Sequence, residues 1–136
     1  MIRVKRVYEP AGPRDGARFL VDRLWPRAIK KEQLHLAGWM KEVGPSPGLR
    51  SWFNHDPEKW EEFLRRYHGE LDRTAEWWEP LIATARKRTV TLLFAARDPH
   101  YNNAVALKAY LDAKLQRRAG MSAARKRKKP SVRKAR

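Results

Sequence analysis

Cysteine is absent from this chain of 136 residues, which removes several classes of chemistry at once. Disulfide bonds, thiolate catalysis and cysteine-ligated metals are all excluded. No apolar run approaches the roughly 18 residues that a membrane span requires. Met1–Arg6 alternates charged with apolar residues, unlike the apolar core of a signal peptide. We therefore expect a soluble, cytoplasmic protein with no membrane partner.

Sequence motifs that mark common enzyme classes are also missing. The chain has no glycine-rich phosphate loop, no Gly-x-Ser-x-Gly elbow and no recognisable hydrolase triad. Its histidines, at positions 35, 55, 68 and 100, lack the i, i+4 spacing of paired metal ligands, so we expect no metal site. These absences leave the cofactor unknown and the question of enzymatic activity open.

Acidic residues are missing from the C-terminal end, where basic residues gather. Residues 117–136 hold ten Lys or Arg and no Asp or Glu, within a chain of net charge +16. So few large apolar side chains cannot support folding, and we predict a domain over residues 1–116 followed by a disordered tail over 117–136. The tail either binds DNA or RNA or only increases solubility. Its predicted nucleic-acid contacts are Arg125, Lys126, Arg127, Lys128, Lys129, Arg133 and Lys134.

The apolar pattern of the remaining chain predicts an α/β fold. Residues 3–8 and 17–24 resemble strands, and residues 89–96 form the nearly continuous apolar run of a strand buried on both faces. Asp56 before Pro57 is a helix-start signature, and an amphipathic stripe follows it. We predict a three-layer α/β domain with a mainly parallel sheet covered by helices.

Proline and other helix-breaking residues predict further boundaries. Residues 30–34 suggest a short helix, whereas residues 36–43 fit either a helix or a strand. Proline disrupts helix interiors, so Pro80 predicts a break at residues 77–79 and a helix that starts at Pro80. Asp98 before Pro99 repeats the earlier signature and predicts the start of a final helix.

Polar side chains follow the ends of several predicted elements. Ligands of open α/β sheets bind beyond the carboxyl ends of the strands, so segments 22–27, 44–56 and 97–103 are candidate ligand contacts. Arginine suits bidentate recognition of phosphate or carboxylate. The predicted ligand-binding residues are Arg23, Trp25, Arg27, Ser46, Arg50, Asn102 and Asn103.

Three residues are candidates for acid–base catalysis, namely Asp22, His55 and Asp98. Histidine titrates near neutral pH and carboxylates can transfer protons. Each residue also has an ordinary structural interpretation: Asp22 can pair with an arginine, His55 can be hydrogen-bonded beside an N-cap, and Asp98 can cap the last helix. The sequence leaves both interpretations open.

Several of these segments together resemble one known family. The segments are Val-Asp-Arg-Leu-Trp-Pro-Arg at 21–27, Trp-Phe at 52–53, His-Asp-Pro at 55–57 and Thr-Leu-Leu-Phe-Ala-Ala-Arg-Asp at 91–98. They resemble the YeaO-like family, a bacterial and archaeal domain of unknown function, from about Ile2 to Leu115. The resemblance implies the α/β fold and the polar cleft, and it implies no reaction. The family pattern usually has glycine where this chain has Ala28 and Asn54. If the fold requires a left-handed backbone at position 28, alanine there strains or reshapes the loop after Arg27.

These observations give three functional hypotheses. The first is a domain that binds a small phosphate-bearing anion, such as a nucleotide, in a cleft formed by Arg23, Arg27, Arg50, His55 and loop 98–103. The second is a nucleic-acid-binding accessory protein that uses the basic tail. The third is a protein-interaction domain in which Trp77 and Trp78 form an exposed patch. The oligomeric state stays open.

Overall fold

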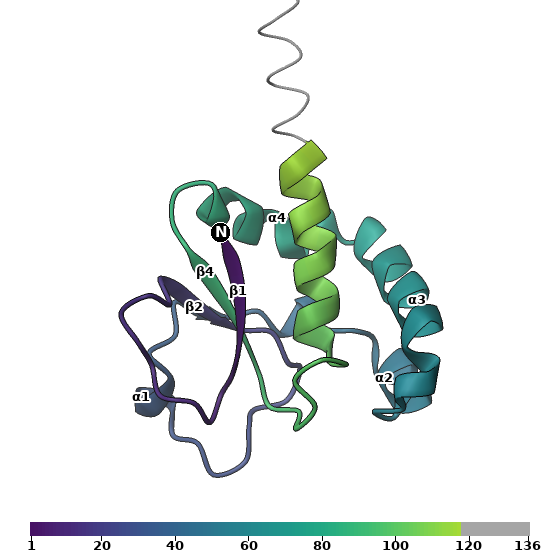
Figure 1. Ribbon diagram of the computed structural model, residues 1–136, viewed down its shortest axis with the longest axis horizontal. Helices are drawn as coiled ribbons and strands as arrows, with labels where there is room; N and C mark the ends of the chain where they lie inside the picture. The colour runs from purple at the N-terminus through teal and green to yellow at the C-terminus, as the bar shows by residue number, and fades with distance from the viewer. Residues whose placement is uncertain (118–136) are drawn as a thin grey trace, which may run out of the picture.

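A computed structural model describes residues 1–117, and the predicted nucleic-acid contacts of the tail lie outside the described residues. Within this range the chain forms a four-stranded, all-parallel sheet with strand order β1-β4-β2-β3 (Figure 1). The strands are β1 (Ile2–Arg6), β2 (Ala17–Leu20), β3 (Gly38–Trp39) and β4 (Val90–Phe94). Every residue of β4 is buried, which confirms the prediction of a strand covered on both faces.

Helices cover the two faces of the sheet unequally (Figure 1). The large core lies under most of the helices and includes Val90 and Leu92, whereas the small core joins Leu93 to Leu34 of α1. The predicted three-layer α/β architecture is therefore confirmed. The helices are α1 (Lys31–Leu34), α2 (Pro47–Phe53), α3 (Trp60–Asp72), α4 (Ala75–Ala85) and the C-terminal helix over residues 103–117, with 3-10 turns η1 (Lys41–Val43) and η2 (Pro57–Lys59).

The ambiguous segment 36–43 contains both kinds of structure. Its first half pairs with β2, because the backbone N–H of Ala37 donates to the carbonyl of Arg18 and that of Met40 donates to Leu20, at 2.7 and 2.8 Å. Its second half is the η1 turn, with Val43 buried. A helical spacing of apolar residues therefore arises here from a very short strand followed by a turn.

The predicted break before Pro80 is wrong, because α4 continues through this proline. Proline removes a single hydrogen bond to the carbonyl four residues earlier. Buried side chains hold the helix on both sides of that position, including Trp78, Leu81 and Ile82. The indole N–H of Trp78 also donates to the carbonyl of Leu71 at 2.8 Å. Burial of this apolar stripe outweighs the missing hydrogen bond.

The start of the C-terminal helix also differs from the prediction. Asn102, not Asp98, caps this helix: its Oδ1 accepts a hydrogen bond from the backbone N–H of Val105 at 2.9 Å. The carboxylate of Asp98 instead accepts from the N–H groups of His100 and Tyr101, which closes a turn before the helix. Asn102 is therefore buried, with 2% of its surface exposed, and is not a solvated residue.

Left-handed backbone occurs at both positions where the family pattern favours glycine. The φ angle is +60° at Ala28 and +45° at Asn54. This conformation costs an ordinary L-residue roughly 1–2 kcal/mol, and asparagine tolerates it better than alanine. The sequence predicted strain at Ala28 only if its backbone were left-handed, and the structure meets this condition.

Replacing Ala28 with glycine is expected to raise the free energy of unfolding by up to about 1 kcal/mol, because relief of strain exceeds the added freedom of the unfolded chain. Urea titration measures this change. The matched control is Ala113→Gly, an exposed site inside the C-terminal helix, where glycine should lower stability by about 0.5–1 kcal/mol. Equal destabilisation by both substitutions would contradict strain at Ala28.

Candidate anion-binding site

The main cleft of the described residues lies at the carboxyl ends of β2 and β4. These strands are neighbours, and the chain leaves them toward opposite faces, from β2 to α1 and from β4 to the C-terminal helix (Figure 1). Such a topological switch point is where open α/β sheets bind ligands. A cavity of about 620 Å³ opens there, and we call it the switch-point cleft.

Most of the predicted site residues line the switch-point cleft together. Ser46 does not, because it lies in a separate groove between α2 and α3, and Asp98 is not among the residues that line the cleft. The role of these side chains in binding stays a prediction. The predicted residues that do line it are Asp22, Arg23, Trp25, Arg27, Arg50, His55, Asn102 and Asn103.

Asp22 joins the structural elements around the switch-point cleft. Its Oδ2 accepts a hydrogen bond from the backbone N–H of Ala95, and its Oδ1 accepts one from Nδ2 of Asn103, both at 3.0 Å. Burial raises the pKa of the Asp22 carboxyl above its usual value, although these hydrogen bonds and the charges of Arg50 and His55 act in the opposite direction. Both carboxylate oxygens therefore have structural partners that connect the ends of β2 and β4 to the helix start.

Arg23 also has a structural role. Its Nε donates to the carbonyl of Pro45 at 2.7 Å and its Nη2 donates to that of Gly44 at 3.0 Å. A Cβ at Gly44 would lie 3.1 Å from Cγ of Arg23 and 3.2 Å from the carbonyl oxygen of Val21, so a larger residue there would have to displace these neighbours slightly. Arg23 thus fixes the loop before α2 against the end of β2.

An aromatic wall forms another side of the switch-point cleft. The indole N–H of Trp25 donates to the carbonyl of Ile29 at 2.7 Å, and its ring packs edge-on against Trp39 at 5.4 Å. Tyr8 follows β1, lines the same cleft and donates its hydroxyl hydrogen to the carbonyl of Arg27 at 3.1 Å. Sequence reasoning missed Tyr8, although its position at the end of the first predicted strand places it at the same edge of a parallel sheet.

Three cationic or titratable side chains line the switch-point cleft without a partner in residues 1–117. Arg27, Arg50 and His55 are exposed, and their side chains make no hydrogen bond or ion pair within that range. His55 has a φ of +55° directly after the left-handed Asn54, so the chain turns sharply at the end of α2. The start of the C-terminal helix, at Asn103, faces the same cleft and adds backbone N–H groups that lack helical acceptors.

Asp98 lies outside this group and is used in its own turn. The backbone N–H of His100 lowers the pKa of the Asp98 carboxyl, burial opposes this effect slightly, and the N–H of Tyr101 adds to the lowering. The charge of His55 also acts on Asp98, which shows that the 98–103 turn and the end of α2 are near one another. An ionised, hydrogen-bonded Asp98 is suited to holding the turn.

Residues 1–117 lack the features of two other kinds of site. None of the helices there has both the length and the apolar character that a membrane crossing needs. The same residues contain no group of three or more His, Cys, Asp or Glu side chains placed to hold a metal ion.

Fold and site together define a three-layer α/β domain with a cleft at its topological switch point. The family model described as "Inactive DUF488-N3 subclade" matches residues 1–132, and the chain belongs to this subclade. It is 42% identical to the uncharacterised protein YeaO of Escherichia coli over 110 residues, which cover 81% of this chain and 96% of YeaO. The membership predicted from sequence motifs is confirmed.

Mycobacterial relatives are about equally similar. The chain is 41% identical to the uncharacterised proteins Rv3073c of Mycobacterium tuberculosis and Mb3100c of Mycobacterium bovis, over 113 residues that cover 83% of this chain and 95% of each relative. No solved structure matches the chain.

Proposed function

We propose that this protein binds a small phosphate-bearing anion, such as a nucleotide, in the switch-point cleft. One observation carries the proposal: the side chains of Arg27, Arg50 and His55 line a single cleft without a hydrogen bond or ion pair in residues 1–117, beside the start of a long helix. Guanidinium groups form strong, bidentate hydrogen bonds to phosphate oxygens. A helix start adds N–H donors and a partial positive charge.

The aromatic wall favours an organic phosphate over the inorganic ion. Tyr8, Leu24 and Trp25 line the switch-point cleft together with polar residues that include Arg50 and Asn103. Small-molecule sites typically have volumes of about 300–1,000 Å³ and combine apolar walls with a few polar groups. A cleft of about 620 Å³ therefore has room for a base and sugar in addition to a phosphate.

We propose binding without turnover. Both oxygens of Asp22 accept hydrogen bonds, from Ala95 and Asn103, and Oδ1 of Asp98 accepts two within its own turn, so both carboxylates already have structural roles. The family description, which calls the subclade inactive, supports the same proposal. Structural roles thus account for two of the three acid–base candidates, and His55 would act as a cationic or hydrogen-bonding contact.

Binding is tested by thermal unfolding of the full-length protein with AMP, adenosine or inorganic phosphate. AMP at about 100 times its dissociation constant should stabilise the protein by roughly 2.7 kcal/mol, with smaller effects from the two fragments. Replacing Arg50 with alanine should weaken AMP binding at least about tenfold, because a hydrogen bond to a charged group contributes about 1.5–3 kcal/mol. The control is Arg86→Ala, an exposed residue outside the cleft. No shift at millimolar AMP or phosphate would refute the proposal.

The third hypothesis, an exposed pair of tryptophans, is corrected by the structure. Trp77 is 43% exposed, but Trp78 is only 4% exposed and packs in the large core. A two-tryptophan interaction patch is therefore not available on α4. The second hypothesis, nucleic-acid binding, retains the support of the +16 net charge.

A further inference from the structure

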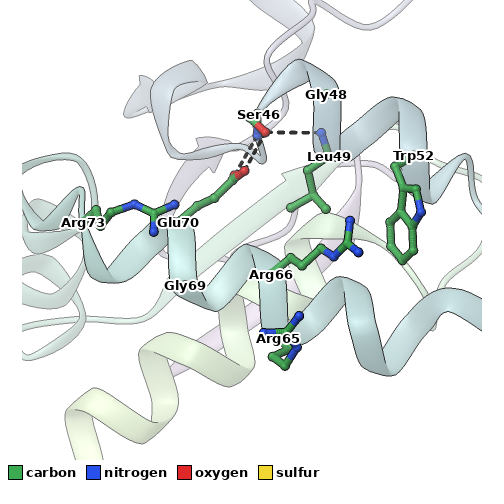
Figure 2. Close-up of a pocket in the computed structure, with 9 residues that line it drawn as sticks. All are labelled: Ser46, Gly48, Leu49, Trp52, Arg65, Arg66, Gly69, Glu70 and Arg73. Atoms are coloured by element: carbon green, nitrogen blue, oxygen red, sulfur yellow. Dashed lines mark hydrogen bonds between the residues drawn. The ribbon is translucent and has the colours of Figure 1, made fainter.

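A second hollow lies on the other side of α2 from the switch-point cleft. Gly48, Leu49 and Trp52 of α2 line it, whereas Arg50 and Phe53 of the same helix line the cleft. The hollow has a volume of about 430 Å³ and is bounded on its other side by α3; we call it the α2–α3 groove (Figure 2). The α3 residues that line it are Arg65, Arg66, Gly69, Glu70 and Arg73.

Two glycines keep the α2–α3 groove open although the fold does not require them. A Cβ built at Gly48 or at Gly69 would meet no atom within 4 Å, and neither residue has a positive φ. Gly69 lies well inside α3, where glycine lowers helix stability relative to alanine. Neither packing nor backbone conformation explains why residue 69 is glycine. The need to keep the groove unobstructed does explain it.

The charges of the α2–α3 groove leave it able to receive an anion. Its carboxylate, Glu70, already accepts hydrogen bonds from the backbone N–H and the hydroxyl of Ser46, at 2.8 and 2.5 Å (Figure 2). The guanidinium of Arg66 lies over the Trp52 ring, 4.3 Å from its centroid, and is thereby held in the groove. Arg73 is exposed, and its side chain makes no hydrogen bond or ion pair in residues 1–117.

The other ion pairs nearby do not cancel this positive charge. Glu62 pairs with Arg65 and Arg66, but it does not line the groove. Each of these exposed pairs contributes little, since solvent screens them. Arg66 keeps further N–H donors beyond the Nε that contacts Glu62.

The spacing of the arginines suits a ligand with repeated phosphates. Arg66 and Arg73 are seven residues apart on α3, a rise of about 10 Å along the helix axis. The side chains of Glu70 and Leu49 lie between them, and the Trp52 indole lies beyond Arg66 at the other end of the groove (Figure 2). Single-stranded nucleic acids present both phosphates and flat base surfaces, and their binding sites combine a basic groove with aromatic side chains.

We propose that the α2–α3 groove is a contact site for the sugar–phosphate backbone of single-stranded nucleic acid. The occupant is a polyanion, because the whole chain carries a net charge of +16 and residues 118–136 add nine Lys or Arg to those of the folded domain. The groove gives the folded domain its own contact with the strand, independent of the switch-point cleft.

The test is fluorescence anisotropy of a labelled oligothymidylate with full-length protein over a range of salt concentrations. Arg73→Ala should weaken binding about three- to tenfold and reduce the log–log salt slope by about 0.7, the value expected for one lost phosphate contact on a single strand. Arg86→Ala removes the same charge from an exposed site outside the groove and should change affinity less than twofold.

A second variant separates binding from folding. Gly69→Ala should raise the melting temperature by about 3 °C, since alanine favours the helix, and yet weaken oligothymidylate binding about threefold because its methyl group enters the groove. Equal effects of Arg73→Ala and Arg86→Ala would overturn the proposal, as would unchanged binding in Gly69→Ala. Equally tight, Arg73-dependent binding of a duplex would overturn the preference for single strands. The nucleotide test at Arg50 is unaffected by any of these outcomes.

Discussion

Replacing Asp15 with alanine is expected to lower the free energy of unfolding by about 3–5 kcal/mol, the range found when one partner of a buried ion pair is removed. Asp15 is 2% exposed, and its carboxylate pairs with the guanidinium of Arg18, which is 4% exposed. It also accepts hydrogen bonds from Lys5 at 3.2 Å and from the backbone N–H of Gly12 at 3.0 Å. The alanine variant leaves Arg18 charged and buried without its counter-ion.

This ion pair connects several elements on the α1 face of the sheet. Nε of Arg18 donates to the carbonyl of Leu34 at 2.7 Å, which ties β2 to the end of α1. The hydroxyl of Thr91 donates to the carbonyl of Asp15 at 2.6 Å, which ties β4 to the loop before β2. Loss of the Asp15 carboxylate is thus expected to loosen both the loop before β2 and the small core, which increases the loss of unfolding free energy.

The Asp15 contribution should depend on pH in a defined direction. Burial disfavours the charged carboxylate, but the hydrogen bonds from Gly12, Lys5 and Arg18 outweigh it and lower the pKa of Asp15 below the usual value of an aspartate. A lowered pKa in the folded state adds stability above the unfolded-state pKa of about 3.9, and that stability is lost as the pH falls through the folded-state pKa. The difference between wild type and Asp15→Ala should therefore be constant near neutral pH and shrink below about pH 4.

Urea unfolding at pH 7 and at pH 3 measures both effects. Asp112→Ala is the matched control, because Asp112 forms an ion pair with Lys108 on the surface of the C-terminal helix. Exposed pairs of this kind contribute about 0–1 kcal/mol. If Asp15→Ala were as mild as Asp112→Ala at pH 7, the buried pair would have no special role in stability.

Replacing Phe63 with alanine is expected to lower the free energy of unfolding by about 3–5 kcal/mol, as large aromatic deletions in cores do. Phe63 is 1% exposed and stacks on Phe53, with their ring centroids 4.2 Å apart. It also contacts Trp60 and Tyr67, with centroid separations of 5.7 and 5.6 Å. The alanine variant removes the centre of this aromatic cluster, and the neighbouring rings can fill the space only partly.

Chemical denaturation again gives the measurement. Phe63→Leu should be milder, with a loss of about 1–1.5 kcal/mol, since it retains most of the buried volume. Trp77→Ala removes a larger aromatic side chain that is 43% exposed, and it should change stability by less than about 1 kcal/mol. A similar loss in Trp77→Ala and Phe63→Ala would show that aromatic content, and not the cluster around Phe63, determines stability.

The elements predicted well from sequence are those whose signals are local. The apolar run at 89–96 is typical of a strand buried on both faces, which β4 is, and the Asp56 cap does accept a hydrogen bond from the backbone N–H of Glu58 before α3. The prediction at Pro80 was wrong because it considered only the local effect of proline. The burial that compensates for the missing hydrogen bond comes from packing in the large core, which the spacing of residues in the sequence does not reveal.

The sequence predicted most of the residues that line the candidate site, but not the structural contacts that their side chains make. Arg23 contacts carbonyls 21 and 22 residues away, so its structural role cannot be inferred from neighbours in sequence. Ser46 was grouped with Arg50, yet the two lie on opposite sides of α2. Asn102 was predicted as a ligand contact, and its role as the helix cap was missed because the cap lies four residues after Asp98.

The strand order has a consequence for synthesis of the chain. β4 lies between β1 and β2 and pairs with both, although about seventy residues separate it from β2 in the sequence. A nascent chain that ends before Val90 therefore has two N-terminal strands with no backbone partner between them. Such long-range closure slows folding, and unpaired strand edges attract other chains. β4, at the centre of this sheet, is the last strand of residues 1–117 to emerge from the ribosome, and until then β1 and one edge of β2 have no strand between them to pair with.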